Sequence, residues 1–179
     1  MTFSQAVRIC FSKYFTFSGR ASRPEYWWFA LFVFAGSFVA GIFDGMIFGF
    51  SPVEVAPNEI SYESDGPLAA IFSLVTLVPI LSAGWRRMHD SGRSGLHLLY
   101  PLIVLIGITI FMGFVSGFDT MLAGDFAGII TSGSSILIGL AIVIFFLSPL
   151  LVLWWLTRPS DPTSNEYGPP PSHIASPSA

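Results

Sequence analysis

Four long apolar runs, separated by short polar segments, dominate the pattern of hydrophobic and polar positions along the chain. A helix that crosses a bilayer needs about 20 consecutive residues that are mostly apolar. Each run meets this requirement, which predicts four transmembrane helices, at about residues 26–50, 68–85, 96–115 and 135–156. We expect residues 26–156 to form one membrane domain, a four-helix bundle, with the polar segment 86–95 as the loop between its second and third helices.

The segment before the first run, residues 1–25, has a different pattern. Its apolar residues recur at helical spacing on one side, at Phe3, Val7, Cys10, Phe11 and Tyr14. This spacing predicts a short amphipathic helix, with Thr2 and Gln5 placed as a capping box. The helix either lies among lipid headgroups or packs on the protein's own loops. The predicted fold class is therefore an all-α membrane protein, with four transmembrane helices plus an N-terminal interfacial amphipathic helix.

Local signals refine these helices. Ser22, Pro24 and Glu25 form a helix start signal, in which the Glu25 side chain reaches back to the first turn. We prefer this capping role for Glu25 to a catalytic one. Pro79 frees the backbone carbonyl one turn earlier, near Val75, and predicts a kink in the second helix.

Small residues recur every four positions in the first predicted helix, at Ser37, Gly41, Gly45 and Gly49. Such a stripe lets another helix approach closely. We expect it to pack against the protein's own helices, with dimerisation as the alternative. Asp44 is the only acidic residue inside a predicted span, and it either reaches the outer membrane interface or serves as an ion or proton ligand.

Composition and charge place the protein in the membrane and orient it. Of the 179 residues, 53% are hydrophobic and 11% are charged, against about 25% charged in an ordinary soluble domain. All eight Lys and Arg residues precede the first run, lie between the second and third runs, or follow the fourth, and the five tryptophans lie at the same boundary. The outer loops carry acids instead, including Asp119 and Asp125. This distribution predicts a multi-pass plasma-membrane protein with both termini and the segment 86–95 in the cytoplasm.

The two ends of the chain carry further information. The first run is longer than the apolar part of a signal peptide, so we interpret it as a retained anchor. The tail, residues 157–179, is rich in Pro and Ser, and its end has the composition of disordered chain. The single cysteine, Cys10, excludes an internal disulfide, and we interpret it as a small apolar residue on a helix face.

Three blocks of sequence resemble one family. They are Phe17–Phe29, with FSGRASRPEYWWF, then Arg86–Gly95, with RRMHDSGRSG, and Asn165–Pro169, with NEYGP. In this order they resemble the domain-of-unknown-function 805 family of small bacterial inner-membrane proteins. The chain departs from the family at Leu96-His97, where an aromatic pair is common. The resemblance implies an inner-membrane protein of unassigned biochemistry.

Five arginines and one serine make up a candidate anion site, at Arg20, Arg23, Arg86, Arg87, Arg93 and Ser94. Guanidinium groups match phosphate geometry, and backbone N–H groups of a Ser- and Gly-rich segment approach an oxyanion closely. The site would bind a lipid headgroup or another anion. The alternative is that the arginines orient the helices, pair with Asp90 and Glu25, and cap carbonyls at the end of the second helix.

Two further groups invite a functional reading. His89-Asp90 has the residue types of an acid–base pair, but we favour a structural His89 that binds a loop carbonyl, because no nucleophile motif accompanies it. The segment of Asn165, Glu166 and Tyr167 is predicted to fold back on the arginine segment, with Glu166 pairing with an arginine and Tyr167 stacking on it. Cys10, His97 and His173 lie too far apart for metal-ligand spacing, so we expect no metal and no cofactor.

The sequence thus favours a non-enzymatic inner-membrane protein that binds anionic lipid or a partner through its arginine-rich cytoplasmic end. Its expected partners are membrane lipids, a second copy or another membrane protein, and no nucleic acid. A small transporter or channel that uses Asp44 is the alternative. An enzyme of lipid headgroup chemistry, using His89 and Asp90, is the third possibility.

Overall fold

The computed structural model describes residues 1–56, 59–64, 66–118, 122–124 and 135–171. Their main elements, in chain order, are α1 (Phe3–Ser12), α2 (Arg23–Phe48), β1 (Phe50–Ala56), β2 (Glu59–Ser64), α3 (Leu68–Asp90), the 3₁₀ helix η1 (Gly95–Leu99), α4 (Tyr100–Ser116) and α7 (Ser135–Thr157). Among the described residues, four helical segments are long and apolar enough to cross a membrane. They are Arg23–Phe48, Leu68–Asp90, Gly95–Val115 and Ile136–Thr157, which confirms the four predicted spans.

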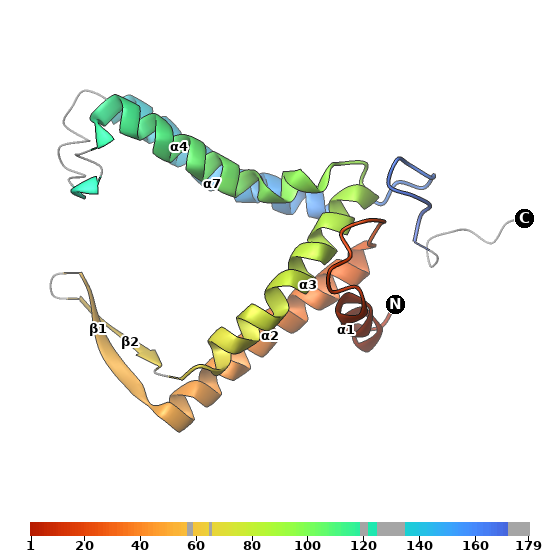
Figure 1. Ribbon diagram of the computed structural model, residues 1–179, viewed down its shortest axis with the longest axis horizontal. Coiled ribbons are helices and arrows are strands. Elements are labelled where there is room, and N and C mark those ends of the chain that lie inside the picture. Colours follow the sequence, from red (N-terminus) through yellow and green to blue (C-terminus); the bar gives the residue numbers. More distant parts are fainter. Residues whose placement is uncertain (57–58, 65, 119–121, 125–134, 172–179) are drawn as a thin grey trace, which may run out of the picture.

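The long helices form two pairs that diverge from one end of the molecule. Figure 1 shows α2 beside α3 in one arm of a V and α4 beside α7 in the other. The four spans therefore do not pack together along their length as the predicted four-helix bundle would (Figure 1). Hydropathy identifies each spanning segment but does not say which faces meet, because lipid covers an apolar face as well as protein does.

Two apolar clusters, which share Tyr26, lie at the end where the arms meet. In the first, Cys10, Phe29 and Ala83 join α1, α2 and α3. In the second, Met88 of α3 packs against Val152 and Leu156 of α7, with Leu98, Tyr100 and Trp155 around them. This end of the molecule holds both the core and the described part of the tail, whereas the opposite ends of the arms lie apart (Figure 1).

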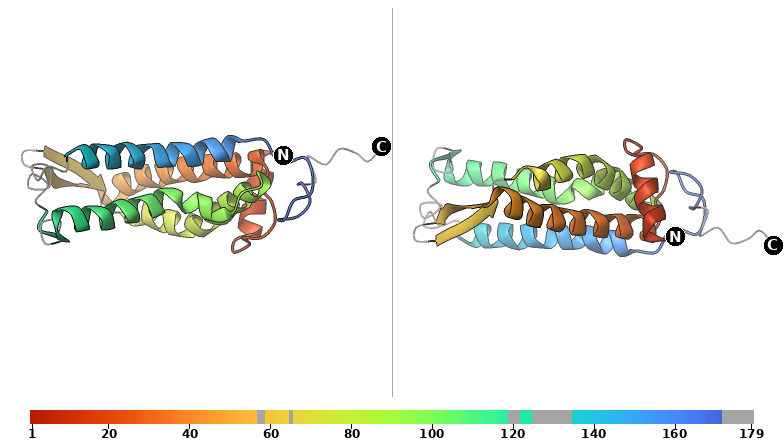
Figure 2. Two further views of the ribbon diagram at one scale, coloured as in Figure 1. Left: turned by 90° about the horizontal axis from the view of Figure 1, so that it is seen from above. Right: turned by 90° about the horizontal axis from the view of Figure 1, so that it is seen from below.

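Helix α1 runs across the ends of the long helices (Figure 2). The predicted capping box is present, because the Thr2 hydroxyl accepts from the Gln5 N–H and the Gln5 side chain accepts from the Thr2 N–H. Ala6 and Cys10 are buried against α2 and α3, while Arg8 is exposed. The helix thus packs on the protein, as one of the two alternatives had it, although on helices rather than on loops.

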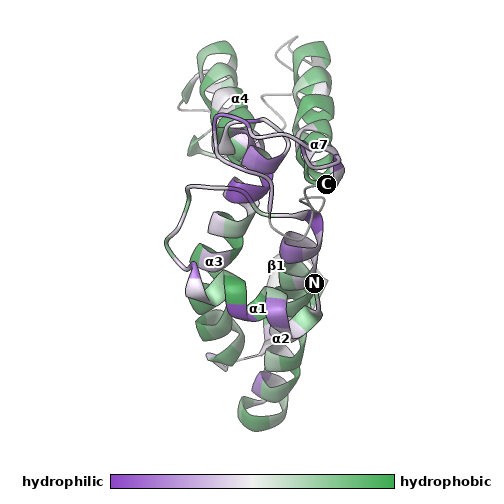
Figure 3. Ribbon diagram, turned by 90° about the vertical axis from the view of Figure 1, so that its right-hand side faces the viewer, coloured by the Kyte–Doolittle hydropathy of each residue, from purple (hydrophilic) through white to green (hydrophobic). Residues whose placement is uncertain are grey.

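The arms expose their apolar residues, and the shared end buries charged ones. Phe34, Leu74 and Phe114 on the arms are 74%, 69% and 77% exposed, as suits side chains that face lipid. By contrast, the largest fully buried side chains are those of Arg86 and Arg87. Figure 3 shows this division, with hydrophobic arms and hydrophilic residues gathered where they meet.

Helix α3 continues past its predicted end at residue 85, as far as Asp90. The segment 86–95 is therefore not a loop throughout, and Arg86, Arg87, His89 and Asp90 lie on the last turns of the helix. A helix fixes the angular spacing of its side chains, so successive residues are aimed at different neighbours. This extension is what allows Arg86 and Arg87 to enter separate contacts.

Two prolines lie inside helices, and a nearby hydroxyl donates to the carbonyl that each proline leaves without a helical partner. Pro79 lies inside α3, and the Tyr14 hydroxyl donates to the Val75 carbonyl at 2.8 Å. Pro149 lies inside α7, and the Ser148 hydroxyl donates to the Phe145 carbonyl at 2.9 Å. The predicted free carbonyl near Val75 is confirmed, and its partner comes from the end of the N-terminal segment.

At the far end of the first arm, β1 and β2 form an antiparallel hairpin that the sequence did not predict. Asp44 of α2 is fully buried, and its carboxylate accepts from the N–H groups of Leu68 at 2.8 Å and Ala69 at 2.7 Å. Helix α3 has Pro67 at its N-cap, without a side-chain cap of its own. Asp44 therefore caps α3 from the neighbouring helix, a role that neither of its predicted readings included.

The predicted stripe of small residues is not the contact between α2 and α3. A Cβ at Gly41 or Gly49 would meet nothing within 4 Å. A Cβ at Gly45 would meet the ring of Phe50, which follows α2 directly in the chain and does not belong to α3. The close approach occurs instead at Gly36, where a Cβ would collide with the Phe72 ring of α3. Ser37 is half-buried beside this position. The outer-loop acids Asp119 and Asp125 lie outside the described residues.

Candidate functional site

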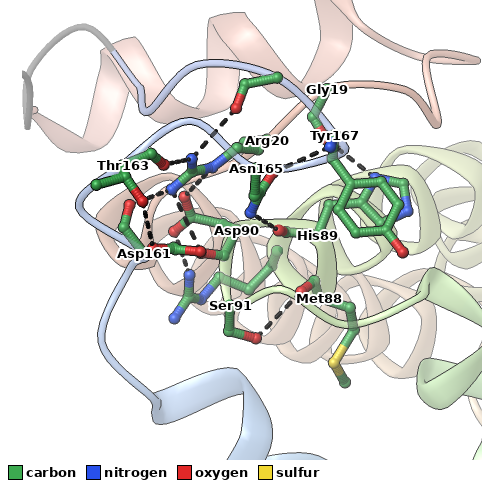
Figure 4. A network of polar contacts seen from close by, with 12 residues as sticks. Gly19, Arg20, Met88, His89, Asp90, Ser91, Asp161, Thr163, Asn165 and Tyr167 are labelled. Carbon is green, nitrogen blue, oxygen red and sulfur yellow. Dashed lines mark hydrogen bonds and ion pairs between the residues drawn. The ribbon is translucent and has the colours of Figure 1, made fainter.

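One carboxylate, that of Asp90, organises the polar end. Its Oδ1 accepts from Arg20 Nε at 2.9 Å, and its Oδ2 accepts from Arg87 Nη1 (Figure 4). All three side chains are almost completely buried. A charge is costly to bury unless it is paired and hydrogen-bonded. The arrangement therefore depends on all its members, and it ties the connector before α2 to the end of α3.

A second buried pair joins Glu25, in the first turn of α2, to Arg86 of α3. The Ser22 hydroxyl accepts from the Glu25 N–H at 3.4 Å, so Ser22 is the predicted N-cap. The Glu25 side chain, however, pairs with Arg86 instead of serving as the reciprocal cap that we predicted. The expected pairing of arginines with Asp90 and Glu25 is confirmed.

The buried arginines also donate to backbone carbonyls. Arg87 donates through Nε to the Leu156 carbonyl at 3.0 Å and through Nη2 to the Arg158 carbonyl. Both carbonyls lie at the C-terminal end of α7, where unpaired carbonyls give a helix partial negative charge. We expected the arginines to cap the second spanning helix, whereas Arg87 caps the fourth.

Arg20 holds the tail in the same way. Its Nη1 donates to the Thr163 carbonyl at 2.7 Å and to the Gly168 carbonyl at 3.3 Å, and its Nη2 donates to the Asp161 carbonyl. The Asp161 N–H donates in turn to the Asp90 carbonyl at 2.8 Å. The predicted return of the tail to the arginine segment is therefore confirmed.

His89 is enclosed by the connector and the tail. Its Nδ1 lies 3.0 Å from the Gly19 carbonyl, and the ring of Tyr167 stacks on it with 3.8 Å between centroids and 5° between planes. Asn165 Nδ2 donates to the His89 carbonyl at 3.0 Å. The structural role of His89 is confirmed, but Tyr167 stacks on this histidine rather than on an arginine. Glu166 is exposed and forms none of the ion pairs of the described residues; its hydrogen bond raises the pKa of Tyr167.

The predicted five-arginine anion site is not assembled on one surface, because Arg20, Arg86 and Arg87 are buried and paired. Arg23 is exposed. Arg93 is half-buried, with its guanidinium 5.7 Å from the centre of the Trp155 ring and Nη1 donating to the Ser91 carbonyl at 3.1 Å. Ser94 caps η1, since its hydroxyl accepts from the Leu96 N–H at 3.4 Å.

The sequence reading missed Arg158, which is exposed at the end of α7 with its guanidinium 5.1 Å from the centre of the Trp154 ring. One signal for it was available. Arg158 follows Trp154 by four residues, which places the two side chains on one helix face. A cation one turn beyond an interfacial tryptophan is suited to the headgroup region.

Two other candidate residues are placed in structural positions. Cys10 is buried, and desolvation, helped by the charge of Glu25, raises its pKa from 9.0 to about 12, although Arg86 and Lys13 act in the opposite direction. Its thiol is therefore inert at neutral pH. The rings of His97 and Trp155 form a T-shaped pair, with 5.1 Å between their centroids. Within the described ranges no three His, Cys, Asp or Glu side chains are grouped to hold a metal ion, and His173 lies outside these ranges.

Comparison with known proteins identifies the family. A family model described as "Protein of unknown function (DUF805)" matches residues 14–169. The chain belongs to this family. Among its relatives is the "Inner membrane protein YhaH" of Escherichia coli (strain K12), 34% identical over 101 residues that cover 56% of this chain and 75% of the relative. The "Inner membrane protein YhaI" of the same strain is 33% identical over 102 residues, which cover 56% of this chain and 74% of that protein.

No solved structure matches the chain significantly. The DUF805 match, the relatives and the four spans together make the chain a multi-pass inner-membrane protein. The family description assigns no biochemistry. The functional question is therefore left to the geometry of the polar end.

Proposed function

We propose that this DUF805 protein is a non-enzymatic membrane protein that binds anionic lipid headgroups through exposed cations of its polar end. The exposed cations are Arg8, Lys13, Arg23 and Arg158, and the half-buried Arg93 lies near them. In this proposal the polar end faces the cytoplasm, as positive-inside bias predicts. Enzyme fusions that report the cytoplasmic or periplasmic side, placed after residue 171 and within the β1–β2 hairpin, test that orientation.

The division of the cations carries the proposal. Arg20, Arg86 and Arg87 neutralise buried carboxylates and carbonyls, so they are not available to an external ligand. By contrast, Arg8, Lys13, Arg23 and Arg158 are exposed. Trp27, Trp28 and Trp154 are exposed at the same end, and tryptophan with arginine or lysine is typical of the headgroup region. Each basic residue near an anionic membrane surface contributes about 1 kcal/mol of attraction.

The other functional readings have less support in the described residues. The Tyr167 ring covers one face of the His89 imidazole, and Nδ1 lies against the Gly19 carbonyl. That face and that nitrogen are therefore closed to a substrate, which disfavours acid–base catalysis by His89. Asp44, which a transporter or channel would use, is engaged as the cap of α3. Binding of a partner protein at the polar end remains the alternative to lipid.

A lipid titration tests the proposal. Native mass spectrometry from a mild detergent would compare phosphatidylglycerol, which is anionic, with phosphatidylethanolamine, which is zwitterionic. We expect phosphatidylglycerol to bind more tightly, and expect that preference to disappear when Arg8, Lys13, Arg23 and Arg158 are all changed to Gln. These side chains lie outside the ion pairs of the described residues, so the variant should keep its unfolding temperature. Equal affinity of the two lipids for the wild type would refute the proposal.

A further inference from the structure

An apolar groove follows α7 beside the first residue of α4 and ends next to an exposed cation. It has a volume of about 500 Å³ and is lined by Tyr100 of α4 and by Ile144, Leu147, Ser148, Leu151 and Trp154, among other residues of α7. A volume of this size lies within the range of small-molecule and lipid sites. Figures 1 and 2 both show α4 and α7 side by side along this arm.

The groove follows one face of α7, and the cation comes directly after the end of that helix. Leu147, Leu151 and Trp154 follow each other at intervals of four and three residues, so these three share a helical stripe, and Arg158 is the first residue after the C-terminal end of α7. The Arg158 guanidinium lies over the Trp154 ring, which itself lines the groove. A positive charge therefore lies at the polar end of the apolar groove.

The buried core fixes this end of α7. Val152 and Leu156, from another face of the helix, are buried against Met88, and Arg87 Nη2 donates to the backbone carbonyl of Arg158. These contacts hold the backbone while the Arg158 side chain stays exposed, and it forms none of the ion pairs of the described residues. A second cation is close by, since Arg93 lies over Trp155, and Trp155 packs on Tyr100 at the groove.

We infer that this groove is a specific site for one anionic phospholipid, whose phosphate pairs with Arg158 while an acyl chain lies along Leu151 and Leu147. The inference rests on the proposed function and narrows it from a cationic surface to a defined site. An arginine fork matches two phosphate oxygens, and stacking on Trp154 orients that fork. The ligand class follows from two features: an arginine that can bind a phosphate, and an apolar groove that extends into the membrane from it.

Charge favours a lipid over a second copy of the chain as the occupant. Two copies in one membrane have the same orientation, so a neighbour that filled this groove would bring its own exposed arginines to the same level as Arg158. Like charges brought together across an interface oppose association. A groove of similar volume, on α2 and α3 between Gly36, Phe43 and Phe72, is likewise lined without Lys or Arg, but among the described residues no arginine lies over a ring of its lining as Arg158 lies over Trp154. Labelling of this second groove therefore shows how strongly an acyl chain binds where no arginine is placed to bind the lipid phosphate.

Photo-crosslinking tests the site. The full-length protein in mild detergent would be incubated with phosphatidylglycerol that carries a diazirine on its acyl chain, illuminated, digested and mapped by mass spectrometry. We expect label to be concentrated on the peptide that contains Ile144 to Trp154, and to be at least tenfold lower on the groove of α2 and α3. An excess of unlabelled phosphatidylglycerol should compete, and an equal excess of phosphatidylethanolamine should compete much less.

Matched variants separate the site from the general surface. Arg158→Gln and Leu147→Trp, which fills the groove at a side chain that is 56% exposed, should each reduce labelling of α7 at least fivefold. Leu153→Trp, at a side chain of α7 that is 46% exposed and outside the groove lining, should leave it unchanged. Because Leu147 and Leu153 are both exposed, neither tryptophan needs to displace the core.

Three outcomes would overturn the inference. Even labelling of all the exposed arms, unaffected by Arg158→Gln, with phosphatidylglycerol still preferred overall, would leave the proposed function standing without this site. Protein–protein crosslinks from the groove peptide, with a dimer in native mass spectrometry, would assign the groove to a second copy. Loss of any preference for phosphatidylglycerol would remove the proposed function as well.

Discussion

Arg20 Nε lies 2.9 Å from Asp90 Oδ1, and this buried pair joins two segments that are 70 residues apart in the chain. The other oxygen of Asp90 binds Arg87, whose remaining N–H groups bind the end of α7. The remaining N–H groups of Arg20 bind the tail and the Asp90 carbonyl. A single carboxylate therefore connects the first arm, the second arm and the tail. The polar end behaves as a fixed base from which both arms extend.

Replacing Asp90 by Asn should destabilise the whole polar end. The change leaves two buried guanidinium groups without their counter-charge, and breaking a buried pair in this way costs about 3–5 kcal/mol. Thermal unfolding in detergent, followed by circular dichroism, measures the effect. Glu166→Gln is the matched control, because Glu166 is acidic but exposed and outside the buried pairs. Equal unfolding temperatures for the two variants would contradict the assignment of Asp90.

Replacing Tyr167 by Ala should release the tail without unfolding the arms. The Tyr167 ring stacks flat on His89, and an aromatic contact of this kind contributes about 0.5–1.5 kcal/mol beyond its buried area. We expect proteinase K to cut between residues 159 and 171 several times faster in the variant. Tyr167→Phe keeps the ring and should be cut at the wild-type rate. A Tyr167→Ala tail as resistant as the wild type would show that the stack does not hold it.

Replacing Asp44 by Ala should loosen the start of α3. The carboxylate accepts two N–H groups of the first turn, and loss of a capping side chain costs about 0.5–2 kcal/mol. Hydrogen exchange should become faster at the amides of Leu68 and Ala69, and less so at the polar end. Gly66→Ala should act in the same direction, because a Cβ there would collide with the Asp44 carboxylate. Unchanged exchange in both variants would remove Asp44 as the cap.

Cys10 should make stability depend on alkaline pH. Burial raises the pKa of its thiol from 9.0 to about 12, so above pH 9 the unfolded chain releases a proton that the folded chain keeps. This contribution to stability is complete below pH 9 and is lost as pH rises towards 12. Cys10→Ala should therefore show a smaller fall in unfolding temperature between pH 8 and pH 10.5 than the wild type. Maleimide should also label the native wild-type protein at pH 7.5 far more slowly than the denatured one.

The sequence predicted the elements that depend on local pattern. Four apolar runs predicted four spans, Thr2 and Gln5 predicted a capping box, and Pro79 predicted the open carbonyl at Val75. Each of these features is set by residues within a few turns of one another. The return of the NEYGP block to the arginine segment was also predicted, because a compact turn with a carboxylate and an aromatic ring suits a basic surface.

The sequence did not predict which partners each polar group would choose. Glu25 was predicted to cap its own helix, Asp44 to reach the interface or bind an ion or proton, and Tyr167 to stack on an arginine. Their principal contacts are instead with Arg86, Leu68 and His89. The burial of Arg20, Arg86 and Arg87 was equally hidden, because arginine is usually exposed. The divergence of the arms could not be predicted from hydropathy, since a face towards lipid and a face towards another helix have the same composition.

The lipid retained by the protein on purification tests the central proposal most directly. The wild type would be extracted in a mild detergent, washed at about 50 mM and about 500 mM salt, and its bound phospholipids quantified against those of the source membrane. Attraction between exposed charges weakens with ionic strength. We predict enrichment of anionic phospholipid at low salt that falls towards the membrane's own composition at high salt. Bound lipid that matches the source membrane at both salt concentrations would contradict binding of anionic lipid at the polar end.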